Sequence, residues 1–305
     1  MLLTLAVCLW GCGNPASGVR ESYTEASEEG SGEAGSADSE AGSDADSEAG
    51  SDADSAAGSS ADSVAGSSAD NDAGSSADSA AGSSDEGSEV LSETGAVIVP
   101  HGSLYPEGFD YSEVPEYSGK KYVIINDGRP FFSDEDITLK SFEYYSSLDE
   151  LGRCGTAYAN ICPELMPTEK RGDISEIHPT GWVQNRYDGI VDADPPYLYN
   201  RSHLIAYKLA GENANIYNLI TGTRYFNAEG MSYVEDKVAD YVRNTGNHVL
   251  YRVTPVFEGD DLLSRGVLME AQSVEDDRIS YCEFIYNVQP GIYLDYSDGY
   301  NKKDR

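Results

Sequence analysis

The N-terminal third of the chain constrains the fold most, because it lacks the large apolar side chains from which a core is built. Residues 13–95 are rich in Ser, Ala, Gly and Asp and repeat with a period of eight, beginning at Ala41 and restarting at Ala49, Ala57, Ala65, Ala73 and Ala81. Stacked units of this kind would bury nothing, so the repeat predicts a disordered linker rather than a solenoid. A folded domain must therefore be built from residues 96–305.

Charge is distributed as unevenly as apolar content. The chain carries a formal net charge of -34, and residues 13–100 hold about twenty acids against the single base Arg20. The remaining residues keep a smaller acidic excess and contain all but one of the 22 Tyr, all seven Phe and Trp182. Overall charge therefore does not favour nucleic acid, and a polyanionic substrate would need a local cationic patch or a bound metal ion.

The first twelve residues predict export. Leu2 to Trp10 is an apolar run that is too short to span a bilayer and fits the apolar region of a signal peptide. Leu9-Trp10-Gly11-Cys12 resembles a bacterial lipoprotein cleavage box, in which Cys12 becomes the lipidated first residue. The alternative is an ordinary secretory signal with incidental cysteines. Both interpretations place residues 96–305 outside the cell, either secreted or anchored to its surface.

Apolar periodicity in residues 96–305 predicts an α+β fold with a central antiparallel sheet and flanking helices. Strands are expected over 121–126, 177–183, 197–205, 248–257, 266–273 and 279–288. One helix is expected from Ser147, which can cap it, with Glu150 completing a capping box. A second is expected over 229–242, where apolar residues recur at helical spacing.

Three cysteines, Cys154, Cys162 and Cys282, form an odd set for a domain expected outside the cell. Cys154 and Cys162 are close enough in sequence to pair, which would leave Cys282 free. The alternative is that all three are small buried apolar side chains. The sequence alone leaves both open.

The chemistry of the chain is concentrated between residues 199 and 235. His203 can act as a general base, because an unperturbed imidazole titrates close to neutral pH. Arg201 lies two residues earlier, and residues i and i+2 of a strand face the same side. A guanidinium and an imidazole would then share one space, which suits an anion attacked by an activated water.

Amide and carboxylate oxygens follow this pair. Asn218 and Asn227 offer neutral oxygen ligands of the kind that hard divalent cations accept, and Glu235 on the second predicted helix could hold a metal-bound water. Each residue also has a structural interpretation. His203 would be a hydrogen-bonded strand residue, the asparagines turn formers, Glu235 a solvated helix residue and Arg201 part of a surface ion pair.

The order of these residues resembles the DNA/RNA non-specific endonuclease family of the ββα-metal, or His-Me finger, type. The family motif Asp-Arg-Gly-His stands here as Asn200-Arg201-Ser202-His203, and the family's following asparagine pair and helix glutamate match Asn218, Asn227 and Glu235. The resemblance covers about residues 120–298. The segments 169–172, 178–182 and 287–291 further resemble secreted and surface DNases of Gram-positive bacteria.

The resemblance implies a catalytic set and a metal. His203 would deprotonate the attacking water, Arg201 and Arg171 would neutralise charge in the transition state, and Asn218 would hold the site together or touch the phosphate. Asn227 would bind one Mg²⁺, with Mn²⁺ or Ca²⁺ as alternatives, and Glu235 would orient a metal-bound water.

Two positions depart from the motif, since Asn200 replaces its Asp and Ser202 its Gly. Neither change removes the base or the metal ligand, although the first removes a carboxylate beside the site.

We therefore expect a domain organisation of leader (1–12), linker (13–95) and non-specific endonuclease domain (96–305). The expected activity is Mg²⁺-dependent hydrolysis of DNA, with RNA as a further substrate, without sequence specificity and without an obligate protein partner. The membrane would be contacted only through the lipid on Cys12. The alternatives are a catalytically impaired surface protein that binds nucleic acid or acts as an adhesin, and a secreted nuclease toxin.

Overall fold

The computed structural model describes residues 90–91 and 96–305. The predicted leader and nearly all of the predicted linker lie outside the described residues. Val90 and Leu91, which fall inside the predicted linker, form strand β1 and pair with the next strand, so regular structure begins before residue 96. In the described part of the chain, every helix is too short or too polar to cross a membrane.

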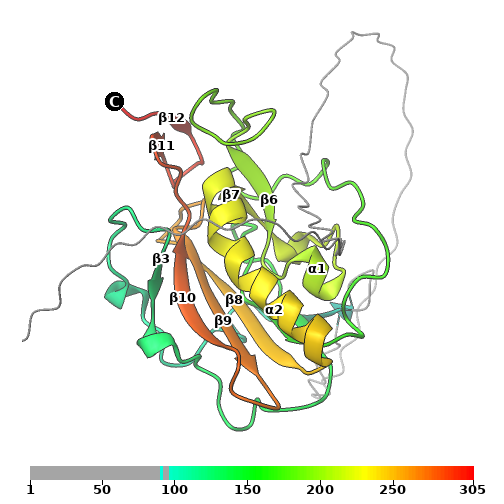
Figure 1. Cartoon of the computed structure of the whole chain (residues 1–305). Coiled ribbons are helices and arrows are strands. Elements are labelled where there is room, and N and C mark those ends of the chain that lie inside the picture. The colour runs from blue at the N-terminus through cyan, green and yellow to red at the C-terminus, as the bar shows by residue number, and fades with distance from the viewer. Residues whose placement is uncertain (1–89, 92–95) are drawn as a thin grey trace, which may run out of the picture. The chain divides into compact units, whose positions relative to one another are not determined.

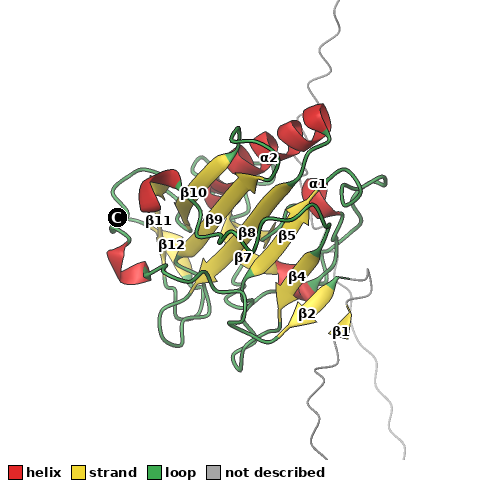
Figure 2. Cartoon of the chain, turned by 90° about the horizontal axis from the view of Figure 1, so that it is seen from below, coloured by secondary structure: helices red, strands yellow, loops and turns green. Residues whose placement is uncertain are grey.

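The domain is built around an eight-stranded sheet, with the order β1-β2-β4-β5-β8-β9-β10-β3 (Figure 2). Its strands are β1 (Val90–Leu91), β2 (Val97–Val99), β3 (Tyr122–Ile124), β4 (Glu143–Ser146), β5 (Ala157–Ile161), β8 (Val249–Val256), β9 (Gly266–Ser273) and β10 (Ser280–Tyr286). All neighbours are antiparallel except β2 and β4, which are parallel. The predicted α+β class with a central antiparallel sheet is confirmed.

Helix α2 (Ser232–Thr245) crosses one face of β8, β9 and β10 (Figure 1). Val234, Val238 and Val242 are fully buried against the sheet, as their helical spacing predicted. The helix ends at Gly246, whose φ of 72° allows the left-handed cap. Its N-terminal end differs from the prediction, because residues 226–231 form a turn of π-helix, η4 (Phe226–Met231), ahead of the α-helix.

Shorter elements complete the fold. They are α1 (Tyr207–Ala210), the 3₁₀ turns η1 (Tyr111–Glu113), η2 (Asn126–Gly128) and η3 (Ile216–Asn218), and two small ribbons, β6 (Tyr199–His203) with β7 (Leu219–Thr223) and β11 (Ile292–Leu294) with β12 (Asn301–Lys303). In the β6–β7 ribbon, His203 pairs with Leu219 and Tyr199 with Thr223.

The β6–β7 ribbon is joined to the main sheet by Asn287, which directly follows β10. The Asn287 side-chain oxygen accepts from the backbone N–H of Thr223 at 3.0 Å, and its amide donates to the carbonyls of Thr221 and Ser264, each at 3.1 Å. Thr223 Oγ1 in turn donates to the carbonyl of Val288 at 2.6 Å. Asn287 is fully buried, so these bonds form in a low-dielectric setting where losing one leaves an unpaired polar group.

Two predicted elements are wrong. The helix expected from Ser147 is a turn, because the Asp149 carboxylate accepts from the backbone N–H groups of Leu151 and Arg153 and so competes with helical bonding. Gly152 then turns the chain with a φ of 78°. The strand expected over 177–183 is an irregular loop, which contains Pro179 and Gly181 with a φ of 70°.

The cysteines follow the second of the two interpretations. Cys154, Cys162 and Cys282 are all free and buried. Cys154 donates to the carbonyls of Ile216 and Leu219, at 3.2 and 3.1 Å. Burial raises the pKa of both the Cys154 and the Cys282 thiol to about 12, which keeps them protonated and unreactive near neutral pH.

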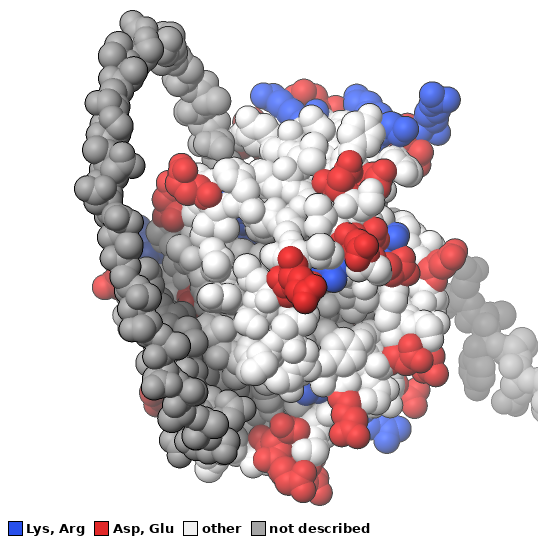
Figure 3. Space-filling model, turned by 180° about the vertical axis from the view of Figure 1, so that it is seen from behind, with Lys and Arg blue, Asp and Glu red and all other residues white. Residues whose placement is uncertain are grey.

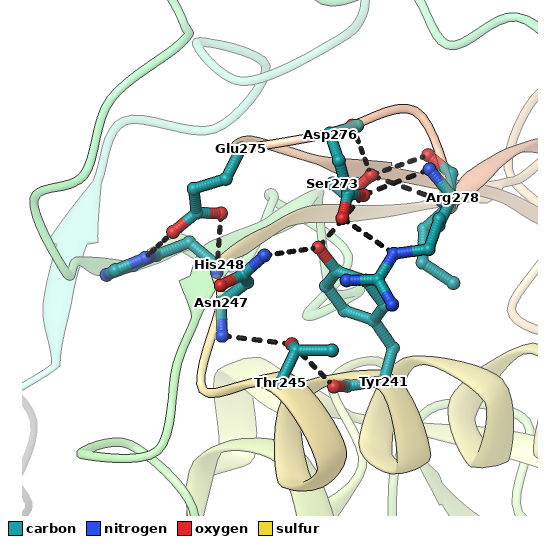
Figure 4. Close-up of polar contacts among 9 residues, drawn as sticks. Tyr241, Thr245, Asn247, His248, Ser273, Glu275, Asp276 and Arg278 are labelled. Atoms are coloured by element: carbon teal, nitrogen blue, oxygen red, sulfur yellow. Dashed lines mark hydrogen bonds and ion pairs between the residues drawn. The ribbon is translucent and has the colours of Figure 1, made fainter.

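A polar cluster fixes the far end of α2 to the turn between β9 and β10 (Figure 4). Tyr241 donates to Asp276 at 3.0 Å and accepts from the Asn247 amide at 3.0 Å. Beside them, His248 Nδ1 lies 2.7 Å from Glu275. The cluster holds α2 at its C-terminal end, which leaves the N-terminal end to be positioned by η4.

On the sheet face opposite α2, a buried ion pair joins β8 to β9. The Arg252 guanidinium donates to both carboxylate oxygens of Glu270 at 2.7 and 2.9 Å, and Glu270 also accepts from the backbone N–H of Phe131 at 2.7 Å. Arg252 is 6% exposed and Glu270 0%. Removing one partner therefore leaves an uncompensated charge in the protein interior.

We predict that Arg252→Met lowers the free energy of unfolding by about 3–5 kcal/mol, measured by urea denaturation. The double variant Arg252→Met/Glu270→Leu should recover part of this loss, because no unpaired charge remains. Arg129→Met is the control, since its ion pair with Asp127 is 77% and 90% exposed and should matter little. A loss below about 1 kcal/mol in Arg252→Met would contradict the prediction.

Candidate active site

His203 is the last residue of β6 and is almost completely buried, with 7% of its surface exposed. Its Nε2 lies 2.8 Å from the backbone carbonyl of Asn213. A carbonyl can only accept, so Nε2 carries the proton, and the lone pair of the neutral ring lies on Nδ1. The hydrogen bond therefore sets the tautomer and leaves Nδ1 as the basic nitrogen.

The surroundings of His203 keep it neutral. Burial, followed by the positive charge of Arg171, lowers its pKa to about 4, against the opposing effect of the backbone of Asn213 and Glu212. A neutral imidazole, with a lone pair on one ring nitrogen, is the form that a general base requires. Arg171, which is exposed, thus acts on His203 through its charge, although the two residues lie 32 positions apart in the sequence.

The loop that carries Arg171 is docked against the segment after β6. Tyr207 in α1 donates to the carbonyl of Glu169 at 3.0 Å. Gly172 packs on Asn213, where an added Cβ would lie 2.8 Å from the Asn213 amide nitrogen. Asn213 therefore contacts both His203, through its carbonyl, and the Arg171 loop, through its side chain.

Asn218 holds the chain immediately after His203. Its side-chain oxygen accepts from the backbone N–H of Ile205 at 2.8 Å, and its amide donates to the carbonyl of the same residue at 2.9 Å. Its own carbonyl accepts from Leu204 at 2.8 Å. Asn218 is fully buried. Because its side-chain oxygen and nitrogen both bond to backbone groups, Asn218 acts as a positioning residue.

Arg201 is also turned toward protein. Its Nε donates to the carbonyl of Ile177 and its Nη2 to the carbonyl of Ser175. The guanidinium lies 4.4 Å from the centre of the Trp182 ring, and Arg201 is only 8% exposed. The arginine thus fastens the loop of residues 173–182 to β6.

Asn227 and Glu235 lie on η4 and α2. The Asn227 side chain is half-buried and makes no hydrogen bond with other described residues, so its oxygen is available to a cation. Glu235 is buried, and Lys208 Nζ lies 3.3 Å from its carboxylate. Burial raises the pKa of Glu235, and Lys208 opposes this effect. Lys208 also pairs with Asp236.

The two motif departures have different surroundings. Ser202 Oγ is buried without a hydrogen-bond partner in the described part of the protein, and it faces Gly222 on β7. A Cβ at Gly222 would collide with this hydroxyl and with the Phe226 ring, so the glycine makes room for the serine. Asn200 pairs with the same Gly222 in the ribbon and is only partly buried.

The structure thus brings His203 and Arg171 close together, and it places Arg201 and Asn218 on the same ribbon as anchors of adjacent backbone. Sequence reasoning missed Asn213, which holds the imidazole, and Lys208, which contacts Glu235. Neither had a local signal, because Lys208 and Glu235 are 27 residues apart and meet only when α1 packs beside α2.

Residues 135–275 match the family model described as DNA/RNA non-specific endonuclease. Over this segment, which is less than half of the chain, the protein is similar to that family. The match lies within the 120–298 span over which the sequence resembles the family, so that resemblance is confirmed. It includes every candidate residue, from Arg171 to Glu235.

A protein named "Deoxyribonuclease", from Streptococcus dysgalactiae subsp. equisimilis, is 34% identical to this domain over 108 residues, which is 34% of this chain and 32% of that protein. The alignment therefore spans about a third of the relative's length. Among solved structures, NucA from Streptococcus agalactiae with a bound magnesium ion has 26% identity and a TM-score of 0.49, covering 55% of this chain and 80% of that one. Sda1 nuclease with a bound zinc ion has 30% identity and a TM-score of 0.46, covering 53% and 81%.

We predict that His203→Ala lowers the rate of DNA cleavage by about 10² to 10⁴ while thermal unfolding still shows a folded domain. The acid limb of kcat/KM should lie near pH 4, because His203 stays neutral above its lowered pKa. Arg171→Gln should move this limb upward, since it removes a charge that disfavours protonation. Wild-type rates in His203→Ala would contradict the assignment.

The same pKa shift has a consequence for folding. Between an ordinary histidine pKa of about 6.5 and the folded value of about 4, the unfolded chain binds a proton at His203 that the folded chain does not. The contribution of His203 to stability is therefore present above that window and is lost as the pH falls through it.

Proposed function

We propose that this protein is a divalent-metal-dependent endonuclease that hydrolyses phosphodiester bonds of DNA, and also of RNA, without sequence specificity. The observation that carries the proposal is the state of His203. Its Nε2 proton is donated to the Asn213 carbonyl, and burial together with the positive charge of Arg171 lowers its pKa to about 4. A neutral base next to a positive charge suits attack of water on a phosphate anion.

In this proposal, His203 Nδ1 takes the proton of the attacking water. Arg171 is exposed and forms no ion pair with a described carboxylate, so its charge is available to the phosphate. Asn218 and Asn213 act through His203, the first by holding the backbone after it and the second by holding its ring. Arg201, whose Nε and Nη2 donate to carbonyls, acts through the loop it anchors rather than by direct neutralisation.

The donor set fits a hydrated metal ion. Among the described residues, no group of three or more His, Cys, Asp and Glu side chains is placed to enclose a metal. Mg²⁺ keeps several waters and commonly takes only one or two protein oxygens, which suits the free side-chain oxygen of Asn227. Glu235, held by Lys208, would accept from a metal-bound water. When bound, the ion would stabilise negative charge on the phosphate.

The acidic surface does not attract a polyanion as a whole. Figure 3 shows one face on which Asp and Glu side chains are widely spread and Lys and Arg side chains are fewer. Contacts to phosphates at a small cationic site give sequence-tolerant binding. We also propose that the protein acts outside the cell, lipid-anchored at Cys12, which incorporation of labelled fatty acid into wild type but not Cys12→Ala would test.

The proposal is tested by incubating the purified full-length chain with supercoiled plasmid and with RNA, in Mg²⁺, Mn²⁺, Ca²⁺ or chelator. We expect nicking and linearisation in Mg²⁺ and none in chelator. Binding of plasmid without cleavage under every metal would refute the enzyme and favour the non-catalytic surface protein. Cleavage in chelator would refute the metal dependence alone.

We predict that Asn227→Ala weakens Mg²⁺ binding, measured by calorimetry without substrate, and lowers cleavage in parallel by about 10- to 100-fold. Raising the Mg²⁺ concentration should restore part of the activity. Asn244→Ala is the matched control, because Asn244 is an exposed asparagine on α2, the helix that follows η4 directly. An unchanged Mg²⁺ affinity in Asn227→Ala would place the ligand elsewhere.

A further inference from the structure

The loop of residues 173–182 is fastened to both strands of the β6–β7 ribbon. From β6, Arg201 donates to the carbonyls of Ser175 and Ile177. From β7, Thr221 Oγ1 lies 3.5 Å from the carbonyl of Pro179. The loop has no regular secondary structure of its own, so these side chains set its position relative to His203.

This loop presents an exposed histidine, His178, beside Arg201. His178 Nε2 lies 3.4 Å from Arg201 Nη2. A guanidinium has donors only, so Nε2 is the acceptor in this contact, and the proton of the neutral ring lies on Nδ1. The ring also packs edge-on against Trp182, with centroids 5.8 Å apart. His178 is therefore held by two neighbours and keeps one N–H donor that no described residue uses.

The Nδ1 donor of His178 is linked through Arg201 to the strand that carries His203, the proposed base. Arg201 and His203 are two residues apart on β6 and share a face, so their Cα atoms are about 6–7 Å apart. His178 contacts the side chain of Arg201, which lies on this shared face. It also packs on Trp182, whose ring contacts Tyr199 two residues before Arg201. An extended polynucleotide whose scissile phosphate is at His203 would bring its neighbouring phosphate toward this position.

The charged groups near His178 are compatible with binding of an anion at this histidine. Arg201 carries a positive charge. The pKa of the nearby Asp173 is lowered mainly by hydrogen bonds from Ser175, and the charge of Arg201 adds to this effect. Asp173 is already engaged, because it accepts from the backbone N–H and the hydroxyl of Ser175 at 2.8 and 3.0 Å. Glu176 is exposed on the same loop.

We propose that His178 forms a subsite for the phosphate next to the scissile one, donating from Nδ1 to a phosphate oxygen. Arg201 is then a positioning residue for this subsite. The inference rests on the proposed nuclease function and names where the substrate extends beyond the cleaved bond. The ligand class is a polynucleotide with at least two consecutive phosphodiesters.

The test compares the full-length wild type with His178→Ala and His178→Asn, because the asparagine amide can replace the Nδ1 donor. A DNA decamer offers neighbouring phosphates, whereas the dinucleotide TpT has only the scissile one. We expect His178→Ala to weaken binding of the decamer in chelator by about 10- to 100-fold, as for loss of a hydrogen bond to a charged group. It should raise KM for the decamer similarly and leave kcat/KM for TpT unchanged.

His178→Asn should recover most of the decamer affinity. His248→Gln is the control, since this histidine lies beyond the other end of α2 and pairs with Glu275 (Figure 4). Arg201→Lys should weaken decamer binding, and adding His178→Ala to it should cause little further loss, because the two residues act as one unit.

The outcomes separate this inference from the function on which it rests. Equal losses on the decamer and TpT would place His178 at the scissile phosphate and overturn the subsite, as would unchanged decamer affinity in His178→Ala. Absence of cleavage by the wild type would refute the proposed function, while the binding titration in chelator would still decide the subsite. Failure of the wild type to bind the decamer in chelator would also overturn the proposed subsite.

Discussion

The position of the β6–β7 ribbon depends on one buried side-chain amide, that of Asn287. The main sheet and the β6–β7 ribbon share no strand pairing, so their relative position is set by side chains. Asn287 bonds the backbone of β7 at Thr221 and Thr223 and that of Ser264 before β9. Gln289 extends the junction by accepting from the backbone of Tyr225 at 3.1 Å, just before η4. The strand that carries His203 and the start of η4, which carries Asn227, are thus both positioned by the same few residues after β10.

Within that frame, amides rather than charges do most of the positioning. Asn218 fixes the backbone after His203, and the Asn213 carbonyl fixes the imidazole itself. A neutral amide satisfies backbone donors and acceptors without adding a charge that would alter the pKa of the base. The charged groups around this arrangement are Arg171, Arg201, which anchors the loop of residues 173–182, and the Lys208–Glu235 pair.

The sequence predicts this architecture wherever local pattern and tertiary structure agree. Alternation and β-branched residues located β8, β9 and β10, and helical spacing located α2. The order of His203, Asn227 and Glu235 identified the family. Prediction failed where a side chain overrode the backbone pattern. The Asp149 carboxylate accepts from N–H groups that a helix would have used for its own hydrogen bonds. Arg201 donates to the carbonyls of Ser175 and Ile177, which in a strand would have accepted from a neighbouring strand. The tautomer of His203 could not be predicted from the sequence either, because it depends on the carbonyl of Asn213, ten residues away.

The free cysteines have a consequence for how the domain is produced. Cys154, Cys162 and Cys282 are buried as free thiols, so the described part of the fold is held together without a disulfide. Folding of this part therefore needs neither an oxidant nor a disulfide isomerase. The domain can therefore reach the same native state under reducing and oxidising conditions. Its production does not depend on the redox environment of the expression host or of the buffer.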